Sequence, residues 1–487
     1  MAPPWGSAVR SSLLLLSVLS GCSLGNIKTQ SCDSSAQCRD AFGFGWECAS
    51  SGYCDAVVPS NRCDDPYPDD LFTRPENYSD AIVLGTLFNH ETAFENLQSI
   101  ELAVDEANID GGLDGTSFAL VHCNYAEDLA LDEDDGETAA KRLTAWLADN
   151  IGTPAIVGPG SSPKVESIWP EAEAAGVLLV SPSATSDALT AIDGELSTDE
   201  SPGLFWRTAP PDSLQAATIA ADIASRGSLS VSIIHQVGAY GEGLASGIES
   251  NLASAPTLFD FENSNDLTAA ISDVGNSAVD EVVFISSDPG DVSAFLNAAD
   301  ASGDYVLKSI FLTDSARDSD VLLTAANASA LFPNIRGTVP VPDPATANLE
   351  DTFYLSYSQR YGQDAGRDGF NTFSYDASWI TLYGVAWATA QESEISGLTI
   401  ARGLRQISDG AGADIPIRAA SWSDVQENFA LGTGIDVFGA SGNLDYDPTT
   451  GETSNPIAIW TVVPDGAGWA FDNEQICDIQ GNCQPAP

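Results

Sequence analysis

Residues 155–185 read AIVGPGSSPKVESIWPEAEAAGVLLVSPSAT, and this stretch predicts one complete β-α-β unit. Its opening apolar strand stops at Gly158-Pro159-Gly160, and Ser161 and Ser162 follow where the N-cap of a helix is expected. Pro163 suits the first helical turn, because the N–H that proline lacks would have no acceptor there. Apolar side chains then recur at helical spacing before a second apolar strand begins.

Both strands of this unit end in small polar residues. Gly176 closes the helix, and the second strand ends in the tip Ser183-Ala184-Thr185. The first N–H groups of a helix lack intrahelical acceptors and carry partial positive charge. We therefore expect Ser161, Ser162 and this tip to hold a small anion, above all a carboxylate. Helix capping by the two serines is the plainer interpretation, and it is compatible with ligand binding.

The composition excludes one class of partner. The chain has 487 residues, room for two or three domains, and its 70 Asp and Glu against 18 Lys and Arg give a formal net charge of -52. No basic stripe exists to neutralise phosphates, so we expect no nucleic-acid partner. We interpret the charge as a solvated surface suited to a salty habitat, with recruitment of a cationic partner as the alternative. The four lysines are Lys28, Lys141, Lys164 and Lys308.

The N-terminus has the features of an export signal. Arg10 precedes an apolar run at 13–19 that is too short to span a bilayer. The run ends in Leu19-Ser20-Gly21-Cys22, which resembles the lipobox of bacterial lipoproteins. That resemblance implies a signal peptide at 1–21, a lipid anchor on Cys22, and a place in the bacterial cell envelope, on the periplasmic side or at the outer membrane. An ordinary signal peptide with a chance cysteine is the alternative.

The remaining eight cysteines suit four disulfide bonds in an oxidising compartment. After a linker at 22–31, residues 32–63 form a small cysteine-rich module in which the pairing of four cysteines stays open: Cys32, Cys38, Cys48 and Cys54. We expect the other bonds to join Cys63 with Cys123 and Cys477 with Cys483. We expect no metal site, because the module has neither a C-x-x-C pair nor a nearby histidine.

Strand and helix patterns alternate through the rest of the chain, beyond a Pro- and Asp-rich linker at 64–78. Such alternation predicts parallel sheets with helices on both faces, and the break at Pro210 and Pro211 divides it into two sheets. Ligands of open parallel sheets bind at the carboxyl ends of the strands, so two facing lobes would form a cleft.

The sequence contains no catalytic constellation. Of its histidines, His122 and His235 lie within strand patterns and are interpreted as structural. It has no nucleophile elbow, no P-loop lysine and no G-x-G-x-x-G after a strand. The acidic run at 132–135 is typical of a helix N-terminus rather than of a calcium site. We therefore expect a binding protein, not an enzyme, without a cofactor.

Several further stretches occur in the order of a known family. They are AVDEANIDGGLDG at 103–115, FWRT at 205–208, YGEG at 240–243 and YDA at 375–377. With the loops at 156–162 and 180–185, they resemble the type I periplasmic binding proteins, specifically the branched-chain amino-acid-binding and receptor ligand-binding-region group. The resemblance extends over residues 81–471, most of the chain.

The resemblance implies a clamshell of two Rossmann-like α/β lobes with parallel sheets, joined by three crossovers. Lobe I would comprise 79–209 and 340–436, and lobe II would comprise 210–339 and 437–487. The residues expected at the ligand are Ser161, Ser162, Ser183, Ala184, Thr185, Tyr240, Asp314, Phe88 and Asn89. In amino-acid-binding members the first-lobe loops meet the α-carboxylate, and an acid of the second lobe, here Asp314, pairs with the α-ammonium. A helix N-cap is the alternative role for Asp314.

The implied function is that of an extracytoplasmic, lipid-anchored solute-binding protein. It would capture an amino acid or related carboxylate in the interlobe cleft and deliver it to an ABC permease. The alternative is a ligand-sensing, receptor-like or protein-interaction lipoprotein, in which the cysteine-rich module docks another envelope protein.

Overall fold

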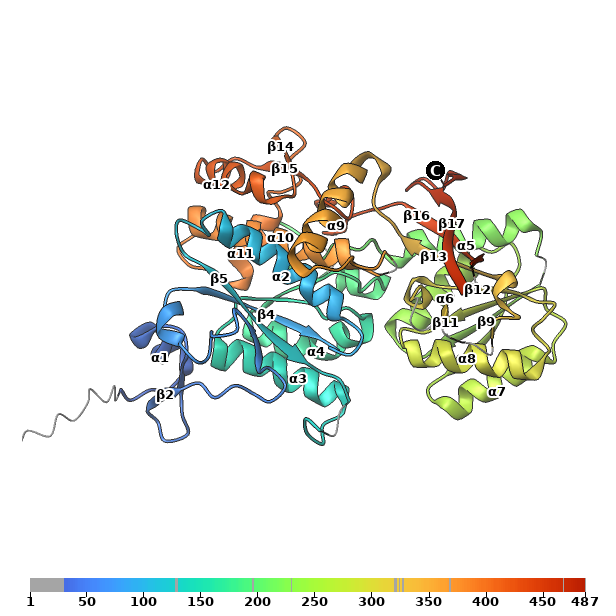
Figure 1. Ribbon diagram of the computed structural model, residues 1–487, viewed down its shortest axis with the longest axis horizontal. Helices are drawn as coiled ribbons and strands as arrows, with labels where there is room; N and C mark the ends of the chain where they lie inside the picture. The colour runs from blue at the N-terminus through green and yellow to red at the C-terminus, as the bar shows by residue number, and fades with distance from the viewer. Residues whose placement is uncertain are drawn as a thin grey trace, which may run out of the picture.

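The computed structural model forms two α/β lobes side by side, with a small module attached to the first (Figure 1). It describes residues 30–127, 130–194, 197–228, 230–318, 322–323, 325, 328–367, 369–466 and 468–486. The expected signal peptide at 1–21 and the lipobox cysteine Cys22 lie outside the described residues. Within the described part of the chain, no helix combines the length and apolar character needed to cross a bilayer.

The first lobe is built on a six-stranded sheet in the order β3-β5-β4-β6-β7-β8. Its strands are β3 (Asp65–Tyr67), β4 (Ile82–Phe88), β5 (Phe118–Asn124), β6 (Ala155–Val157), β7 (Leu178–Ser181) and β8 (Phe205–Arg207). All neighbours pair in parallel except the edge strand β3, which runs antiparallel to β5. The β-α-β unit predicted from residues 155–185 is confirmed as β6, α4 and β7.

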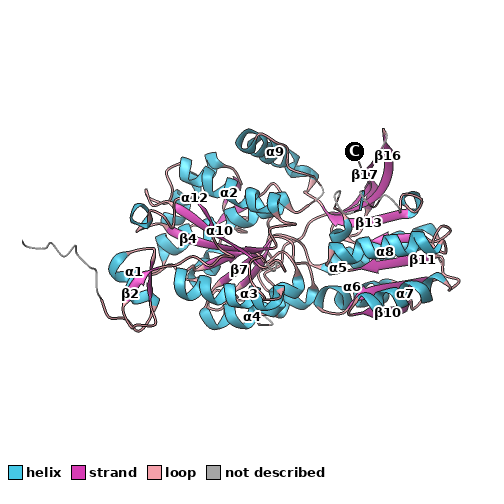
Figure 2. Cartoon of the chain, turned by 60° about the horizontal axis from the view of Figure 1, so that its bottom comes forward, coloured by secondary structure: helices cyan, strands magenta, loops and turns pink. Residues whose placement is uncertain are grey.

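Helices cover both faces of this sheet, with α2, α10 and α12 on one side and α3 and α4 on the other (Figure 2). They are α2 (Phe94–Ile109), α3 (Gly136–Trp146), α4 (Ser162–Ala175), α9 (Ala347–Tyr361), α10 (Asn371–Gln391), α11 (Gly397–Leu404) and α12 (Trp422–Ala430). A parallel pair, β14 (Ala413–Pro416) and β15 (Ile435–Phe438), completes the lobe. Nearly all side chains of α10 are buried, as expected of a helix without a polar face.

The second lobe is built on an eight-stranded sheet in the order β10-β9-β11-β12-β13-β16-β17-β18. Its strands are β9 (Val231–Gln236), β10 (Thr257–Phe261), β11 (Glu281–Ile285), β12 (Ser309–Leu312), β13 (Ile335–Pro340), β16 (Ile457–Asp465), β17 (Gly468–Cys477) and β18 (Cys483–Pro485). Its helices are α5 (Asp212–Arg226), α6 (Ala239–Asn251), α7 (Ser264–Gly275) and α8 (Pro289–Ser302). Short 3-10 turns lie at Pro75–Tyr78, Asp187–Ala191, Asp314–Ala316, Phe332–Asn334, Pro344–Thr346 and Ala419–Ser421, and a π turn at Leu147–Ile151.

Each sheet carries antiparallel strands at one edge, beside the parallel strands that the sequence predicted. From β16 onward the pairing in the second sheet is antiparallel. Between β16 and β17 this follows from their short connection, which permits only antiparallel pairing. In the first lobe, β3 adds one antiparallel edge strand. Both sheets are therefore mixed, with a parallel centre that carries the strand ends described below.

The chain crosses between the two sheets three times. The first crossing follows β8, and the second follows β13. The third lies between Tyr446, which is buried in the first-lobe core, and β16. The predicted boundary between 436 and 437 is therefore too early, because the apolar side chains of Val437 and Leu444 are buried in that same core.

The cysteine-rich module contains α1 (Ser35–Phe42) and the hairpin of β1 (Trp46–Cys48) and β2 (Cys54–Ala56). Its disulfides join Cys32 with Cys48 and Cys38 with Cys54, and the bonds Cys63–Cys123 and Cys477–Cys483 form as predicted. Arg39 Nη1 attaches the module to the first lobe by donating to the carbonyls of Asp149 and Asn150, at 2.8 and 2.9 Å.

The segment expected as a linker at 64–78 belongs to the first lobe. It supplies β3, whose Pro66 is tolerated because an edge strand can leave one ladder donor missing. Leu71 from the same segment is fully buried in the lobe's core. The composition of this stretch suggested a linker, but its tertiary contacts make it part of the lobe.

Candidate ligand-binding site

A cleft of about 720 Å³ lies between the two lobes. Its first-lobe wall comes from residues that follow β4, β5, β6 and β7, and its second-lobe wall from residues that follow β9, β11 and β12. These are the carboxyl ends of the parallel strands, where ligands of open α/β sheets bind. The central, parallel part of each sheet therefore faces the cleft.

Eight of the nine residues expected at the ligand line this cleft: Phe88, Asn89, Ser161, Ser162, Ser183, Thr185, Tyr240 and Asp314. The ninth, Ala184, is fully buried and is not among the lining residues. Its N–H donates to Ser181 Oγ at 3.0 Å, and its carbonyl accepts from Arg207 Nη1 at 2.9 Å. Ala184 therefore does not line the cleft, because its backbone groups are already used to hold the tip.

The two first-lobe loops are tied to each other by hydroxyl groups. Ser162 Oγ accepts from the backbone N–H of Ser186 at 3.1 Å, and Ser183 Oγ donates to the carbonyl of Gly160 at 2.8 Å. A Cβ at Gly160 would lie 2.8 Å from Ser183 Oγ, so a side chain there would displace the hydroxyl that ties the two loops. The side chains of both serines thus fix the shape of this wall.

The backbone of the same corner is open. Ser161 has the extended conformation of an N-cap, but its side chain makes no capping bond. Among the described residues, neither the Ser161 nor the Ser162 backbone N–H donates a hydrogen bond. Unpaired N–H groups at a helix start suit an anion. This corner therefore has the chemistry expected for a carboxylate.

Arg207 of β8 supports the tip from behind. Its buried guanidinium donates to the carbonyls of Ala184 and Ser186, both at 2.9 Å. Its Nε and Nη2 form a two-point ion pair with Glu452 of the third crossover, each contact at 2.6 Å. One side chain thus connects the tip to the segment that joins the lobes.

The second-lobe wall presents a carboxyl group. The Tyr240 hydroxyl donates to Asp314 Oδ1, which also accepts from Gln215 Nε2 at 3.2 Å. Gln215 Nε2 donates in addition to Asp212 Oδ1 at 3.0 Å, so the amide bridges two buried carboxyl groups. Burial raises the pKa of Asp314, and burial together with the neighbouring Asp314 raises the pKa of Asp212.

The N-cap role considered for Asp314 does not occur. The short turn Asp314–Ala316 has Thr313 at its N-cap and no side-chain capping bond. The Asp314 carboxyl instead contacts Tyr240 and Gln215 at the cleft wall.

The structure also shows the surroundings of other positions that the sequence singled out. Phe88 is buried at the end of β4, and Asn89 Oδ1 accepts from the N–H of Glu91 at 3.0 Å. The predicted helix N-terminus at 132–135 is confirmed, since Asp135 Oδ1 accepts from the N–H of Thr138 at 2.7 Å. Among the described residues, the one grouping of metal-ligating atoms is Cys32, Cys38 and Cys48, and all three are in disulfide bonds.

The structure adds lining residues that the sequence reasoning missed. Lys164 lies in the first turn of α4, and its Nζ is 5.5 Å from the centre of the Tyr125 ring. Burial lowers the pKa of Lys164 and raises that of Tyr125 to about 12. Lys164 was recognisable from spacing, three residues after Ser161 on the same turn, whereas Tyr125, Gln236 and Ser287 carry no such signal.

A sequence profile described as periplasmic binding protein matches residues 92–434, which is most of the chain. The chain belongs to the periplasmic binding protein family. This periplasmic binding protein is therefore an extracytoplasmic binding protein and not an enzyme, as the sequence predicted.

One relative of this periplasmic binding protein is the chemotactic signal transduction system substrate-binding protein BasB of Halobacterium salinarum. The two are 26% identical over 376 residues, which cover 74% of this chain and 81% of the relative.

Solved structures confirm the two-lobed fold. The branched-chain amino acid transporter substrate-binding protein LivJ from Streptococcus pneumoniae, in complex with isoleucine, has a TM-score of 0.59 at 19% identity and covers 81% of this chain and 99% of its own. A solute-binding protein of an ABC transporter from R. palustris, in complex with 4-hydroxybenzoate, has a TM-score of 0.60 at 14% identity and covers 82% and 97%.

Proposed function

We propose that this protein captures a small carboxylate, either an amino acid or an aromatic carboxylate, in the interlobe cleft and delivers it to an ABC permease. One observation carries the proposal. The unpaired N–H groups of Ser161 and Ser162 and the hydrogen-bonded pair of Asp314 and Tyr240 line the same cleft. The first suits a carboxylate, and the second suits an ammonium or a hydroxyl. The isoleucine and 4-hydroxybenzoate complexes of the similar structures support both ligand classes.

Binding would act through closure of the lobes. Each wall supplies only part of the contacts, so a ligand that touches both walls favours the closed arrangement by its differential affinity for it. The three crossovers are the segments about which the lobes would turn. Under this proposal the expected ligand contacts are the eight lining residues named above, Ala184 being excluded.

A lipid anchor on Cys22 completes the proposal, with residues 1–21 removed as a signal peptide. The lipobox-like stretch Leu19-Ser20-Gly21-Cys22 supports it. Cys22→Ser should abolish incorporation of radiolabelled palmitate and release the protein from the membrane fraction. Unchanged labelling of the variant would refute the anchor.

Ligand sensing is the second candidate function. Its support is the similarity to BasB, whose name places that protein in chemotactic signal transduction, together with a disulfide-bonded module that a plain carrier does not need. Deleting the gene separates the two: loss of ligand uptake indicates transport, and loss of chemotaxis with normal uptake indicates sensing.

Thermal unfolding tests the ligand class. The mature protein is heated with L-isoleucine, L-leucine, benzoate or 4-hydroxybenzoate, and a ligand at about 100 times its Kd should stabilise it by about 2.7 kcal/mol. D-isoleucine and benzyl alcohol are matched controls, because the first has the wrong chirality and the second lacks the carboxylate. If none of the four acids raises the unfolding temperature, the proposed ligand class is wrong.

A further inference from the structure

One loop of the first-lobe wall is held by chain that precedes the lobe's first parallel strand. The loop joins β5 to α3 and is described at 125–127 and 130–135. It brings Tyr125, Ala126 and Glu127 to the cleft, and Gly136 at the start of α3 lines the cleft as well. Segment 60–63, the end of the cysteine-rich module between β2 and β3, packs against this loop.

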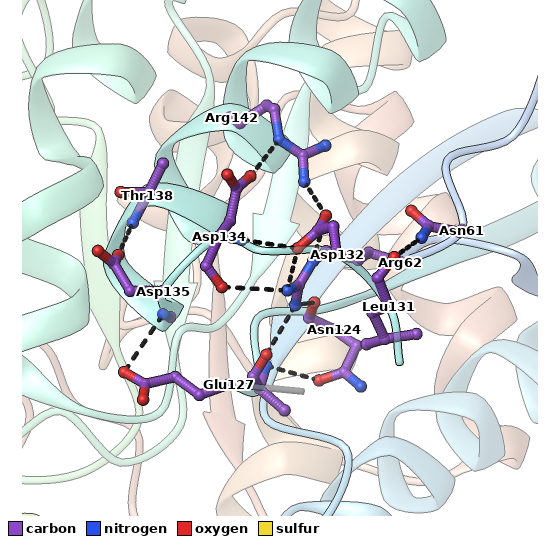
Figure 3. A network of polar contacts seen from close by, with 12 residues as sticks. Asn61, Arg62, Asn124, Glu127, Leu131, Asp132, Asp134, Asp135, Thr138 and Arg142 are labelled. Carbon is purple, nitrogen blue, oxygen red and sulfur yellow. Dashed lines mark hydrogen bonds and ion pairs between the residues drawn. The ribbon is translucent and has the colours of Figure 1, made fainter. Parts of the chain in front are cut away.

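Arg62 is the centre of that contact, and its side chain is completely buried. Its Nη1 donates to the carbonyls of Asn124 and Ala126, at 3.1 and 2.7 Å. Its Nε donates to Asp132 Oδ2 at 2.8 Å, and its Nη2 donates to the other carboxylate oxygen of Asp132. Figure 3 shows the guanidinium between the two limbs of the loop.

Neighbouring contacts hold the same segment in register. The side chain of Asn61 donates to the carbonyl of Leu131, and the N–H of Asn124 donates to the carbonyl of Arg62 at 2.7 Å. The Cys63–Cys123 disulfide links the residues immediately beside these contacts. From the α3 side, Arg142 donates to Asp132 at 2.6 Å and to Asp134 at 2.8 Å (Figure 3).

We propose that Arg62 is a positioning residue of the ligand site: segment 60–63 clamps the β5–α3 loop and thereby sets the first-lobe wall of the cleft. The contacts named for its guanidinium go to this loop and to the end of β5 from which the loop starts, and they use the planar fork of donors that only arginine offers. The end of the cysteine-rich module is thus part of the construction of the site. This proposal does not depend on the identity of the ligand.

Lys164 reports on the loop without any ligand. Its amine lies over the Tyr125 ring, and a Cβ added at Gly136 would lie 3.4 Å from its Nζ. The charged groups that face it are Glu127, Asp135, Glu137 and Lys141. Burial lowers the pKa of Lys164 by more than the three carboxylates raise it, so a displaced loop that admits water should let the pKa rise. Because the chain has only four lysines, each acetylated peptide can be quantified separately.

The experiment measures the pH dependence of acetylation of Lys164 by acetic anhydride in Arg62→Met and in the wild-type mature protein, with peptide mass spectrometry. We expect the pKa of Lys164 to rise toward the ordinary lysine value of 10.5. Arg226→Met is the matched control. It removes an arginine whose ion pair with the buried Glu281 lies in the second lobe, and it should lower the unfolding temperature without moving the pKa of Lys164.

Asp132→Asn is the second variant, and it separates loop displacement from direct electrostatics. Loss of the Arg62 cation by itself raises a nearby lysine pKa, and loss of the Asp132 anion by itself lowers it. A displaced loop raises the pKa of Lys164 in both variants, so the same upward shift in both supports the clamp. A downward shift or no shift in Asp132→Asn, or an equal upward shift in Arg226→Met, overturns it. Asp132→Asn leaves the Arg62 bonds to the two carbonyls in place and decides the question even if Arg62→Met does not fold.

Discussion

The two lobes use their buried polar groups differently. In the first lobe, Arg207 and the hydroxyls of Ser162 and Ser183 connect loops to one another and to a crossover. In the second lobe, Gln215 holds two buried carboxyl groups, of which Asp314 reaches the cleft and Asp212 leaves Oδ2 without a partner among the described residues. In the first wall, side chains therefore hold loops whose backbone N–H groups face the cleft. In the second wall, side chains themselves face the cleft.

This difference predicts where substitutions act. Side chains of the first lobe should matter chiefly for stability and for the shape of the wall, because the expected ligand contacts are backbone groups. Side chains of the second lobe should matter for the choice of ligand, because the contact is the side chain itself. Each prediction below tests one side of this comparison, from the largest expected effect to the smallest.

Arg207→Met should lower the free energy of unfolding by about 3–5 kcal/mol, because the buried carboxylate of Glu452 loses its cationic partner. Denaturant titration measures it. Arg402→Met is the control, since its pair with Glu392 is part-exposed and should contribute about 1 kcal/mol or less. Equal losses in both variants would show that the tip does not depend on Arg207.

The pH dependence of stability should reveal Asp376, which lies fully buried in α10. Its carboxyl accepts from the N–H groups of Ala440 and Ser441, at 3.1 and 2.6 Å, and so holds the chain before the third crossover. Burial raises the pKa of Asp376 to about 7 from the ordinary 3.8. The folded state therefore keeps a proton that the unfolded state loses, and this stabilisation is full below about pH 4 and gone above about pH 7.

The corresponding loss of unfolding free energy between these pH values is up to about 4 kcal/mol. Asp376→Asn cannot ionise, so its stability should change less over this range than that of the wild type. Denaturant titrations at pH 4.5 and 7.5 give the comparison. Identical pH slopes for variant and wild type would contradict the assignment.

Asp314→Asn should weaken binding of an amino acid by about 100-fold, or about 2.7 kcal/mol, because the ammonium loses its charged partner. Binding of benzoate, which has no ammonium, should change far less. Calorimetry with whichever acid stabilises the wild type measures the effect. Asp288→Asn, a cleft residue whose side chain caps α8, is the control. An amino acid bound equally well by Asp314→Asn would remove this residue from the site.

Ser162→Ala should lower the free energy of unfolding by about 1–3 kcal/mol, because the buried N–H of Ser186 loses its acceptor. Ser167→Ala, on the same helix, removes a hydroxyl that donates to the carbonyl of Lys164, and we expect a change of about 0.5 kcal/mol. If Ser162→Ala unfolds like the wild type but loses ligand affinity, Ser162 contacts the ligand through its hydroxyl, and the first wall resembles the second.

Much of the fold was predictable because its signals are local. The apolar runs, N-cap residues and glycines of residues 155–185 lie within a few positions of one another, and the unit forms as β6, α4 and β7. Eight of the nine expected site residues reach one cleft for a related reason: the ends of parallel strands meet at a common edge. Ala184 does not line the cleft, because side chains of Ser181 and Arg207 occupy its backbone groups.

The sequence by itself determined the β-α-β rhythm, because periodicity needs no knowledge of distant contacts. The pairings Cys63–Cys123 and Cys477–Cys483 were expected, but an even cysteine count does not fix them, and the structure confirms them. Only the tertiary structure decided that β3 belongs to the first lobe, where the third crossover begins, and that Arg62 lies under the wall of the cleft. These depend on pairs of residues far apart in the chain, and a burial or pairing partner that is distant in sequence leaves no mark in the local pattern.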